Sequence, residues 1–523
     1  MPLRSQPVSQ RRIEVKSSSI RSACGPTGSR ACRRLRADIG WLRRAALCDD
    51  ARMRAPEADL IVRGGRVVTA GHEQEADVAI TGGRIVQLGG ELSGRRELDA
   101  HGLLVLPGGI DAHVHLVCAA LAAGSAAAGW PFWVDDFWSG SRAAIAGGIT
   151  TIGSMTGQLP GETMTDAIRR DMAGASAEAA VDWFLHPILP GTGADTAAEA
   201  VALARDGHTS NKLFLTVPDF DIDTGELAQL VTAAGQAGAI TLVHCEEAGL
   251  VAEAGQELIA AGRGAVRYFA DARTVEAEVQ AVGRAVDLSR TADVPVYVVH
   301  LSSAEALARC HAARSAGARV YVETRPLYLH LTRERFGEPD GAKYVGAPPL
   351  RTLADREALW HGLAAGQIDT VCSDHAPWTL DQKLDPDLDV MTARQGVADL
   401  ETLMPMLFSE GVLTGRISLT RFVQLTSANA ARLFGLHPRK GTIAPGADAD
   451  LVLWDPHARR VVDGAAMQSR AGYSVYDGWQ VTGWPVVVLR RGQVVLADGV
   501  ITAKPGDGQW LRRQASGAPD VTI

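Results

Sequence analysis

The sequence predicts an α/β protein: a (β/α)₈ TIM barrel with a small β-sandwich domain built from both ends of the chain. Short alternating strands broken by Gly-Gly turns occupy residues 60–106, and strands of the same character return at 450–495. Between them, eight apolar strand candidates alternate with stretches of helical periodicity. Residues able to bind a metal follow several of these strands, at the ends where such barrels carry their chemistry.

The 523 residues are too many for one ordinary core and are compatible with a large barrel plus a smaller module. The changes of sequence texture predict four parts. Residues 1–54 form an N-terminal extension, and residues 55–106 together with 440–513 form the sandwich. The barrel spans residues 107–439, and residues 514–523 form a C-terminal tail.

The N-terminal extension is rich in arginine and serine and poor in acids. A disordered tail, a targeting peptide and an untranslated upstream extension all fit this composition. Because globular patterning begins just after Met53, we hypothesise that Met53 is the natural start and that residues 1–52 are absent from the native protein.

The composition of the chain indicates which classes of binding partner to expect. Hydrophobic residues make up 46% and charged residues 21% of the chain, which is normal for a soluble globular protein. The net charge of -8 gives no reason to expect nucleic acid or an anionic membrane, and no apolar run approaches the length that spans a bilayer. Seven cysteines without paired spacing fit a reducing compartment. We therefore expect a soluble, cytoplasmic protein without nucleic-acid or membrane partners.

The individual strands follow from apolar runs bounded by turn residues. In the sandwich we expect strands at Leu60–Val62, Arg66–Val68, Val78–Ile80, Arg84–Val86, Asp450–Trp454 and Val486–Val495. In the barrel the eight strand candidates end near His115, Gly153, Leu189, Leu215, His244, His300, Glu323 and Asp374. Helical periodicity is visible at Ala304–Arg314, and a late helix is expected at Ser427–Phe434.

The first barrel strand, Pro107–His115, ends in a His-x-His pair. Residues i and i+2 of a strand point to the same side, so His113 and His115 can both reach one metal ion. Such a pair is a weak signal alone. Four more candidate ligands at strand ends strengthen it: Lys212, His244, His300 and Asp374.

Four histidines and an aspartate suit two divalent metal ions, zinc first and manganese or cobalt as alternatives. Two ions held close together need an anionic bridge, which an ammonium group cannot supply but a lysine carboxylated by carbon dioxide can. Lys212 ends an apolar strand, where a free ammonium is costly. Its alternative is an ion pair with Asp374; with four histidines present, we favour the bridging carbamate.

Asp374 has a second expected role. A metal acidifies a bridging water, whose hydroxide attacks an amide carbonyl. A carboxylate that touches this water can accept its proton and deliver it to the leaving nitrogen, so we expect Asp374 to be catalytic as well as a ligand. Asp111 is expected either to hold a ligand histidine in its binding tautomer or to be a buried acid bonded to the backbone.

Together these motifs resemble the amidohydrolase superfamily, and within it the hydantoinase, dihydropyrimidinase and allantoinase group of cyclic amidases. The resemblance spans about residues 58–513, and its strongest segments are Pro107–His115, Asn211–Leu215, Val243–Glu246, Val299–Ser302, Pro348–Arg351 and Ser373–Pro377. It implies one metal held by His113, His115, Lys212 and Asp374, and another held by His244, His300 and the same N6-carboxylated Lys212. It also implies ring opening of a small cyclic amide or imide, and a homotetramer or homodimer.

The chain departs from this group at three positions. Val217 stands where hydantoinases carry a tyrosine that helps stabilise the oxyanion, a donor worth about 3 kcal/mol. Val117 stands where dihydroorotases carry an arginine, which argues against that activity, and the stretch after it differs from the usual short loop. Arg325 replaces a frequent cysteine and is expected either to hold a substrate carboxylate or to pair with an acid such as Glu323.

Ala347 and Gln395 match the positions where relatives hold the substrate ring through backbone groups. The sequence thus predicts a binuclear metal hydrolase that opens a hydantoin- or dihydropyrimidine-like ring by attack of a metal-bridging hydroxide. An allantoinase-like enzyme for another heterocycle is the nearest alternative. A non-catalytic scaffold is more distant, because the chain keeps every ligand.

Overall fold

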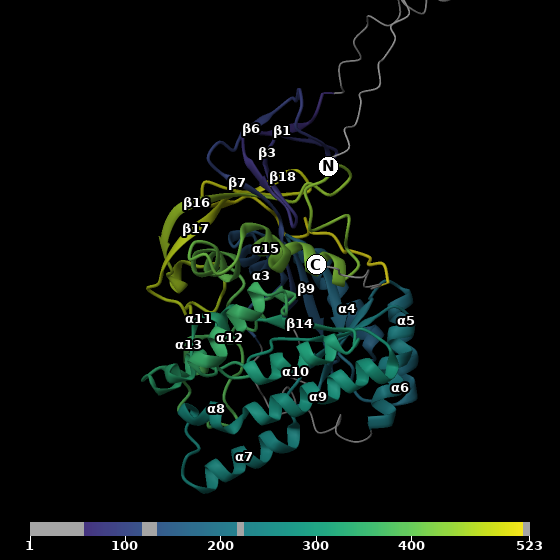
Figure 1. Cartoon of the computed structure of the whole chain (residues 1–523), viewed down its shortest axis with the longest axis vertical. Coiled ribbons are helices and arrows are strands. Elements are labelled where there is room, and N and C mark those ends of the chain that lie inside the picture. The colour runs from purple at the N-terminus through teal and green to yellow at the C-terminus, as the bar shows by residue number, and fades with distance from the viewer. Residues whose placement is uncertain (1–56, 118–132, 217–223, 516–523) are drawn as a thin grey trace, which may run out of the picture. The chain divides into compact units, whose positions relative to one another are not determined.

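The computed structural model describes residues 57–117, 133–216 and 224–515 (Figure 1). The chain divides into two compact units, Met1–Glu57 and Ala58–Ile523, and only the second is described below. The predicted N-terminal extension and the hypothesis about the natural start lie outside the described residues. Within those residues, no helix is long and apolar enough to cross a membrane.

Eight parallel strands form two sheets at the centre of the described chain, in the orders β10-β9-β8 and β11-β12-β13-β14-β15. Nearly every residue in them is buried, as expected for parallel strands covered on both faces. Their bounds are β8 Gly109–Val114, β9 Ile149–Thr156, β10 Asp182–Pro187, β11 Ser210–Phe214, β12 Ile240–His244, β13 Val296–Val298, β14 Val320–Thr324 and β15 Thr370–Val371.

Single parallel bridges connect these two sheets at both edges. Ile188, just after β10, pairs with Lys212 in β11, and Val114 in β8 pairs with His375, just after β15. The order of the strands in space is therefore their order in the chain. The residues that follow their carboxyl ends come together at one end of the strands, which is where the candidate ligands lie.

Helices connect consecutive parallel strands, and α4, α5, α6, α9 and α10 lie along their outer side in Figure 1. Capping boxes at Asp136 and Thr163 begin α3 and α4, because each cap side chain accepts a backbone N–H that the helix leaves unpaired. The long helices are α3 Phe137–Ala146, α4 Met164–Glu178, α5 Ala194–Arg205, α6 Thr224–Gln236, α7 Ala248–Ala260, α9 Val275–Ala292, α10 Ala304–Ser315 and α12 Leu353–Ala364.

Short helices fill the remaining connections. They are α8 Phe269–Ala272, α11 Pro326–His330, α13 Leu380–Lys383, α14 Leu403–Leu407, α15 Leu419–Val423 and α16 Asn429–Leu433. The predicted late helix is confirmed in position, but it begins earlier. α15 continues through a π-helical segment, Gln424–Ala428, into α16.

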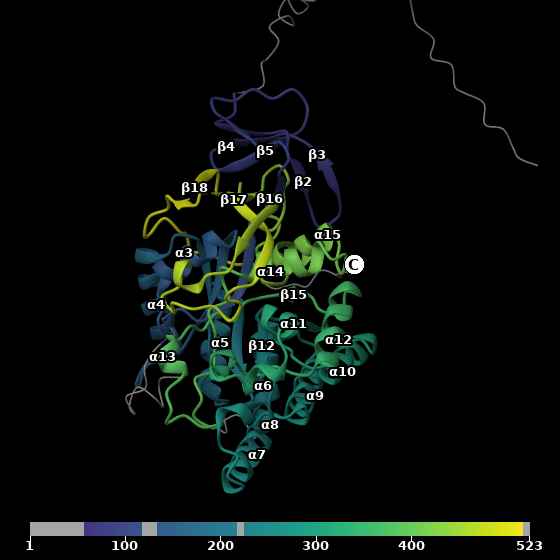
Figure 2. The same cartoon turned by 90° about the vertical axis from the view of Figure 1, so that its left-hand side faces the viewer.

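Two further sheets lie beside the parallel strands. A four-stranded sheet has the order β5-β4-β1-β6, and a seven-stranded sheet has the order β19-β18-β17-β16-β7-β2-β3. Figures 1 and 2 show their purple and yellow strands side by side. The bounds are β1 Leu60–Arg63, β2 Arg66–Val68, β3 Glu73–Glu75, β4 Val78–Thr81, β5 Arg84–Leu88, β6 Glu97–Asp99, β7 Leu104–Pro107, β16 Leu451–Val461, β17 Gln480–Arg490, β18 Gln493–Ala497 and β19 Val500–Ile501.

The seven-stranded sheet draws its strands from both ends of the chain. β7 pairs antiparallel with β16, so that Leu104 lies opposite Trp454 and Leu106 opposite Val452. A common apolar cluster joins the two ends as well, since early strand residues such as Val62 pack with late ones such as Leu489. The hydrophobic effect, which grows with the apolar area removed from water, therefore holds the ends together.

The last described segment packs against its own chain. Trp510 forms a parallel bridge with Trp183, and Leu511 is fully buried. The buried guanidinium of Arg513 donates to the hydroxyl of Ser210 at 2.7 Å and to the carbonyl of Leu185 at 3.0 Å. Residues 510–513 thus contact β10 and β11 close to their buried side chains.

Candidate metal centre

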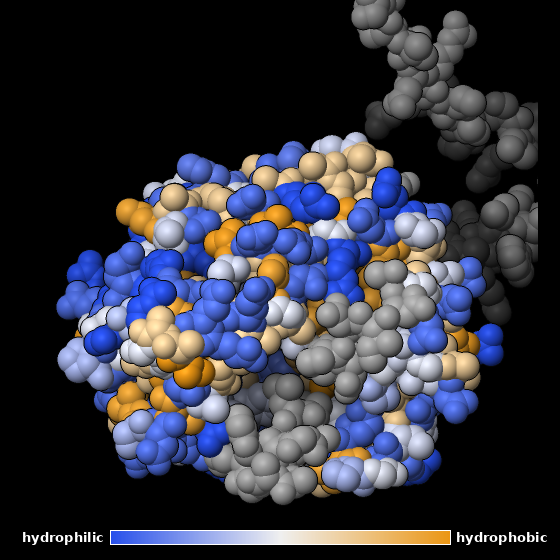
Figure 3. Space-filling view, turned by 90° about the horizontal axis from the view of Figure 1, so that it is seen from below, coloured by the Kyte–Doolittle hydropathy of each residue, from blue (hydrophilic) through white to orange (hydrophobic). Residues whose placement is uncertain are grey.

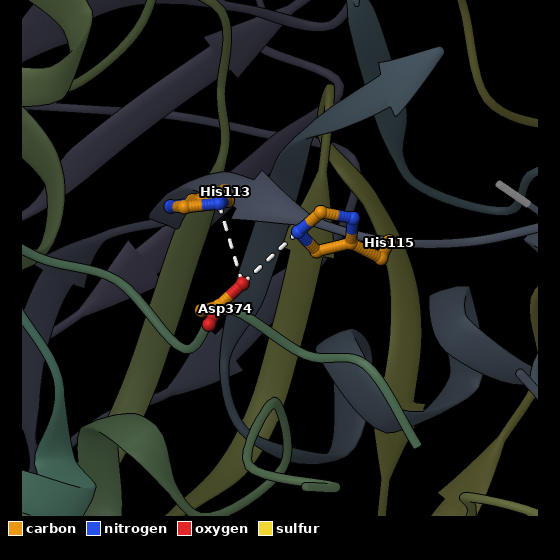
Figure 4. Close-up of side chains that lie close together, drawn as sticks. All are labelled: His113, His115 and Asp374. Carbon is orange, nitrogen blue, oxygen red and sulfur yellow. Dashed lines mark ion pairs between the residues drawn. The ribbon is translucent and has the colours of Figure 1, made fainter. Parts of the chain in front are cut away.

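His113, His115 and Asp374 form a buried cluster whose candidate ligand atoms all lie within 4.8 Å of one another. Figure 4 shows both imidazoles turned toward the same carboxylate oxygen. Nε2 of His113 lies 3.3 Å and Nε2 of His115 lies 3.0 Å from Oδ1 of Asp374. The strand period of two places the histidines on one side of β8, and the bridge between Val114 and His375 brings Asp374 beside them.

His244, His300 and Lys212 complete this cluster. The rings of His300 and His244 lie 4.4 Å apart, and the rings of His300 and His113 lie 5.4 Å apart. Lys212, His244 and His300 line one cavity of about 70 Å³ together with His115 and Asp374. The structure therefore brings all six predicted ligands together.

Backbone geometry marks the same residues. His300 has φ +38° and Asp374 has φ +49°, which are unusual values for residues with a side chain. His300 lies two residues after the short parallel strand β13, and Asp374 lies three residues after β15. Such strained conformations persist where the surroundings impose them and gather at functional sites. Here they turn two candidate ligand side chains toward the cavity that both residues line.

The histidine nitrogens fit a metal. Nδ1 of His113 bonds Oε1 of Glu323 at 2.7 Å, and Nε2 of His244 bonds Oε2 of Glu246 at 2.7 Å, which leaves the other nitrogen of each ring for a ligand role. Nδ1 of His300 is buried and has no hydrogen-bond partner among the described residues. Burial lowers the pKa of His115 to about 4, so this imidazole is neutral, as a metal ligand must be.

Glu323 and Glu246 are supporting residues that sequence reasoning did not assign to the site. Oε1 of Glu323 also accepts the backbone N–H of His300 at 3.0 Å, and its Oε2 accepts the hydroxyl of Tyr297 at 2.9 Å. Glu246 is held by Arg273 through bonds of 2.7 and 3.0 Å. Carboxylates that hold ligand histidines orient the rings and raise their basicity. A buried acid within or just after an apolar strand is the signal that could have revealed both.

Asp111 takes the second of its two predicted roles. Its carboxylate accepts the backbone N–H groups of His113 and Ser373, both at 3.1 Å, and no imidazole contact to it is present among the described residues. It therefore ties β8 to the segment that follows β15. The histidine-holding role predicted as its alternative belongs to Glu323. Burial raises the pKa of Asp111 to about 7.

Arg325 pairs with Asp374. Its Nη1 donates to Oδ2 at 2.8 Å, and the side chain is fully buried behind Asp374 and does not itself line the cavity. The predicted ion pair therefore exists, but its partner is Asp374, because Glu323 is already engaged with His113. Burial opposes ionisation of Asp374, yet Arg325 and the histidines outweigh it and hold the pKa well below its usual value.

Ala347 and Gln395 line the cavity with the ligands, as do the aromatic side chains of Trp133 and Phe214. The indole N–H of Trp378 donates to the carbonyl of Gln395 at 2.7 Å. The oxyanion position, Val217, and the loop after Val117 lie outside the described residues. Figure 3 views the molecule from the side on which α7 lies and shows a mostly hydrophilic face that is hollowed near its centre.

Parallel strands between helices, with a cluster of histidines, a lysine and an aspartate at their carboxyl ends, define a candidate metal-dependent α/β hydrolase. A family model described as the amidohydrolase family matches residues 104–495. The chain belongs to this family.

Within this family, the chain is similar to several named relatives and solved structures. The chain is 37% identical over 421 residues to a D-phenylhydantoinase of Escherichia coli, a match covering 80% of this chain and 89% of the relative. A D-hydantoinase from a Bacillus species is 37% identical with a TM-score of 0.83, covering 87% of this chain and 99% of that one. A dihydropyrimidinase from Brevibacillus agri is 35% identical with a TM-score of 0.82, covering 88% and 99% of the two chains.

Proposed function

We propose that the chain is a binuclear metal-dependent hydrolase that opens a cyclic amide or imide ring of the hydantoin or dihydropyrimidine type. The observation that carries this proposal is the convergence of six candidate ligands in one buried cluster beside a cavity. The names of the similar enzymes, D-phenylhydantoinase, D-hydantoinase and dihydropyrimidinase, support the same substrate class.

In this proposal the two parallel sheets are one closed (β/α)₈ barrel, and the bridges at Ile188 and Val114 are its seams. We propose the boundaries that the sequence predicts for the sandwich, residues 55–106 with 440–513. Closure supports the function because it brings the ends of distant strands, such as β8 and β12, around one site.

His113, His115 and Asp374 would hold one ion and His244 and His300 the other, with carboxylated Lys212 shared between them. Nitrogen and carboxylate donors in this ratio suit zinc, with manganese or cobalt as alternatives. Lys212 is fully buried and lines the cavity with the candidate histidine ligands, where an ammonium would repel two bound cations and an anionic carbamate would balance them. When bound, the ions supply an acidified water and polarise the amide carbonyl.

The side chains around the cavity supply the rest of the chemistry. Asp374 accepts the proton of the attacking water and passes it to the leaving ring nitrogen. Arg325 holds the outer oxygen of that carboxylate, so Oδ1 stays turned toward the histidines. Backbone groups of Ala347 and Gln395 bind the ring, and Trp133 and Phe214 exclude water from it.

The aromatic wall points to a ring with an apolar substituent. Trp133 packs 4.9 Å from the ring of His115 and 6.0 Å from that of Trp378, so an indole stands beside a candidate ligand. Aromatic faces favour aryl groups through offset or edge contacts. We propose a 5-aryl hydantoin as the preferred substrate and a homotetramer, as the resemblance implies, as the working assembly.

The test is ring-opening activity of protein loaded with zinc or manganese in the presence of bicarbonate. The panel holds hydantoin, 5-phenylhydantoin, dihydrouracil, allantoin and succinimide. Hydantoin turnover that disappears in Lys212→Ala, together with about two ions per subunit in the unmodified chain, is the expected result. Turnover of allantoin alone would favour the allantoinase-like alternative. A metal-loaded chain that opens none of the rings would overturn the proposal.

A further inference from the structure

Lys383, the last residue of α13, is a buried cation with an unusual set of partners. The side chain is about 1% exposed. Its ammonium donates to three backbone carbonyls, those of Val345 at 2.6 Å, Arg394 at 2.5 Å and Gly396 at 2.9 Å. No carboxylate within the described chain forms an ion pair with it. Burial lowers its pKa well below the usual lysine value.

The three carbonyls belong to two segments that line the cavity. Val345 lies two residues before Ala347, and Arg394 and Gly396 flank Gln395, so the lysine joins both predicted substrate-binding backbones. A backbone bond from Gly396 to the carbonyl of Val345, at 3.0 Å, supplements this junction. The ammonium group and this backbone bond together set the spacing between the two segments.

The second segment, residues 394–396, also packs closely against the residues that follow the candidate ligand Asp374. Gly396 has φ +117°, and a Cβ at this position would stand 2.3 Å from the carbonyl oxygen of Ala376, two residues after Asp374. The indole of Trp378 holds the carbonyl of the neighbouring Gln395. The consecutive carbonyls of residues 394, 395 and 396 are therefore all held by side chains from 378–383.

Burying an ammonium group is costly, and only close polar partners offset the cost. A cation that spans two loops gives the backbone a fixed position, because moving either loop would leave a buried charge with fewer acceptors. Rigid supports of this kind place binding groups within a fraction of an ångström of their productive geometry.

We propose that Lys383 is a positioning residue for substrate recognition: it holds the backbones of Ala347 and Gln395 at the spacing that the ring requires. The inference rests on the proposed function, because those backbones contact substrate only in a ring-opening enzyme of this kind. The described partners of Lys383 include none of the candidate ligands. Its loss should therefore weaken substrate binding without emptying the metal centre.

The test compares Lys383→Met with a matched control, Arg421→Met. Arg421 is also a buried cation bonded to backbone carbonyls, those of Leu363 at 2.8 Å and Ile368 at 2.6 Å, but these lie before β15, at the end of the strand away from Asp374. Steady-state kinetics on the ring that the unmodified chain opens best, metal content and Tm are measured for each protein.

We expect Lys383→Met to raise KM about tenfold, the effect of a displaced hydrogen-bonding group, with kcat changed by less than about threefold. Metal content should equal that of the unmodified chain. Lys383→Gln, which keeps an uncharged N–H donor group, should give a KM between those of Lys383→Met and the unmodified chain. Arg421→Met should lower Tm and leave KM unchanged.

An unchanged KM in both Lys383 variants would overturn this inference while leaving the proposed function intact. Equal KM changes in Lys383→Met and Arg421→Met would overturn it too, since any buried cation would then have the same effect. If neither Lys383 variant folds, the residue serves stability and the positioning role is rejected. An unmodified chain that opens no ring would overturn the proposed function first, and this inference with it.

Discussion

Arg325 holds the outer carboxylate oxygen of Asp374 at 2.8 Å, and both side chains are buried. The same carboxylate meets two histidines through its other oxygen, so it is shared between a structural cation and the candidate metal centre. The proposed catalytic carboxylate of Asp374 is therefore held by Arg325, one of the residues at which this chain departs from the group it resembles.

Replacing Arg325 with methionine should destabilise the fold strongly. The change removes one partner of a buried ion pair and leaves Asp374 without its counter-charge, a loss of about 3 kcal/mol. Urea denaturation of the metal-free protein measures it as a lower midpoint. Arg325→Lys, which keeps the charge, should lose less. A midpoint unchanged in Arg325→Met would show that the pair contributes nothing.

Glu323→Gln should weaken metal binding. The carboxylate holds Nδ1 of His113, and loss of such a support lowers metal affinity by about 10–100-fold. Metal titration monitored by activity and by bound metal per subunit measures the change. Glu401→Gln is the control, since this half-buried glutamate accepts a backbone N–H from Gln468 and none of its described partners is a candidate ligand. Equal affinities in the two variants would contradict the supporting role.

Trp133→Ala should change substrate preference more than overall activity. The indole lines the cavity beside His115 and offers an aromatic face worth about 1 kcal/mol to an aryl group. We expect KM for 5-phenylhydantoin to rise by about fivefold and KM for unsubstituted hydantoin to stay the same. Trp133→Phe should recover most of the loss. If both substrates are affected equally, the tryptophan does not select the substituent.

Asp135 should make stability depend on acid pH. Burial opposes its ionisation, but bonds from His375 and from the chain at 469–470 outweigh it and lower its pKa from 3.8 to about 2. A lowered pKa gives stability that is complete above about pH 4 and is lost as the pH falls toward 2, roughly 2 kcal/mol in all. Thermal unfolding of Asp135→Asn and of the unmodified chain between pH 5 and 2.5 measures it. A constant Tm difference over that range would contradict the prediction.

Much of the candidate site could be predicted from sequence because its ligands follow apolar strands. His113 and His115 belong to one strand, and Asp374 ends another, so local patterns sufficed to nominate them. Strand lengths were less predictable: β9 continues to Thr156, beyond the expected end at Gly153. Burial on both faces removes the alternation that would mark where such a strand stops.

The supporting residues could not be predicted, since their partners lie far away in the chain. Glu323 and His113 are separated by 210 residues, and nothing near either residue indicates the other. Arg325 illustrates the same limit: its expected partner was a substrate carboxylate or a nearby acid such as Glu323, and in the fold it pairs with Asp374. Pairings of this kind arise from the folded arrangement of strands and not from local pattern.

The union of the chain's two ends in one sheet has a consequence for its synthesis. Leu104 of β7 lies opposite Trp454 of β16, 350 residues later, and β7 pairs only with β2 until β16 has been made. A ribosome adding 5–20 residues per second needs roughly 18–70 s for such a stretch. For that time the apolar edge of β7 has no late partner, and an open strand edge is a template for aggregation. Nascent chains stalled before residue 451 should therefore depend on chaperones that shield this edge.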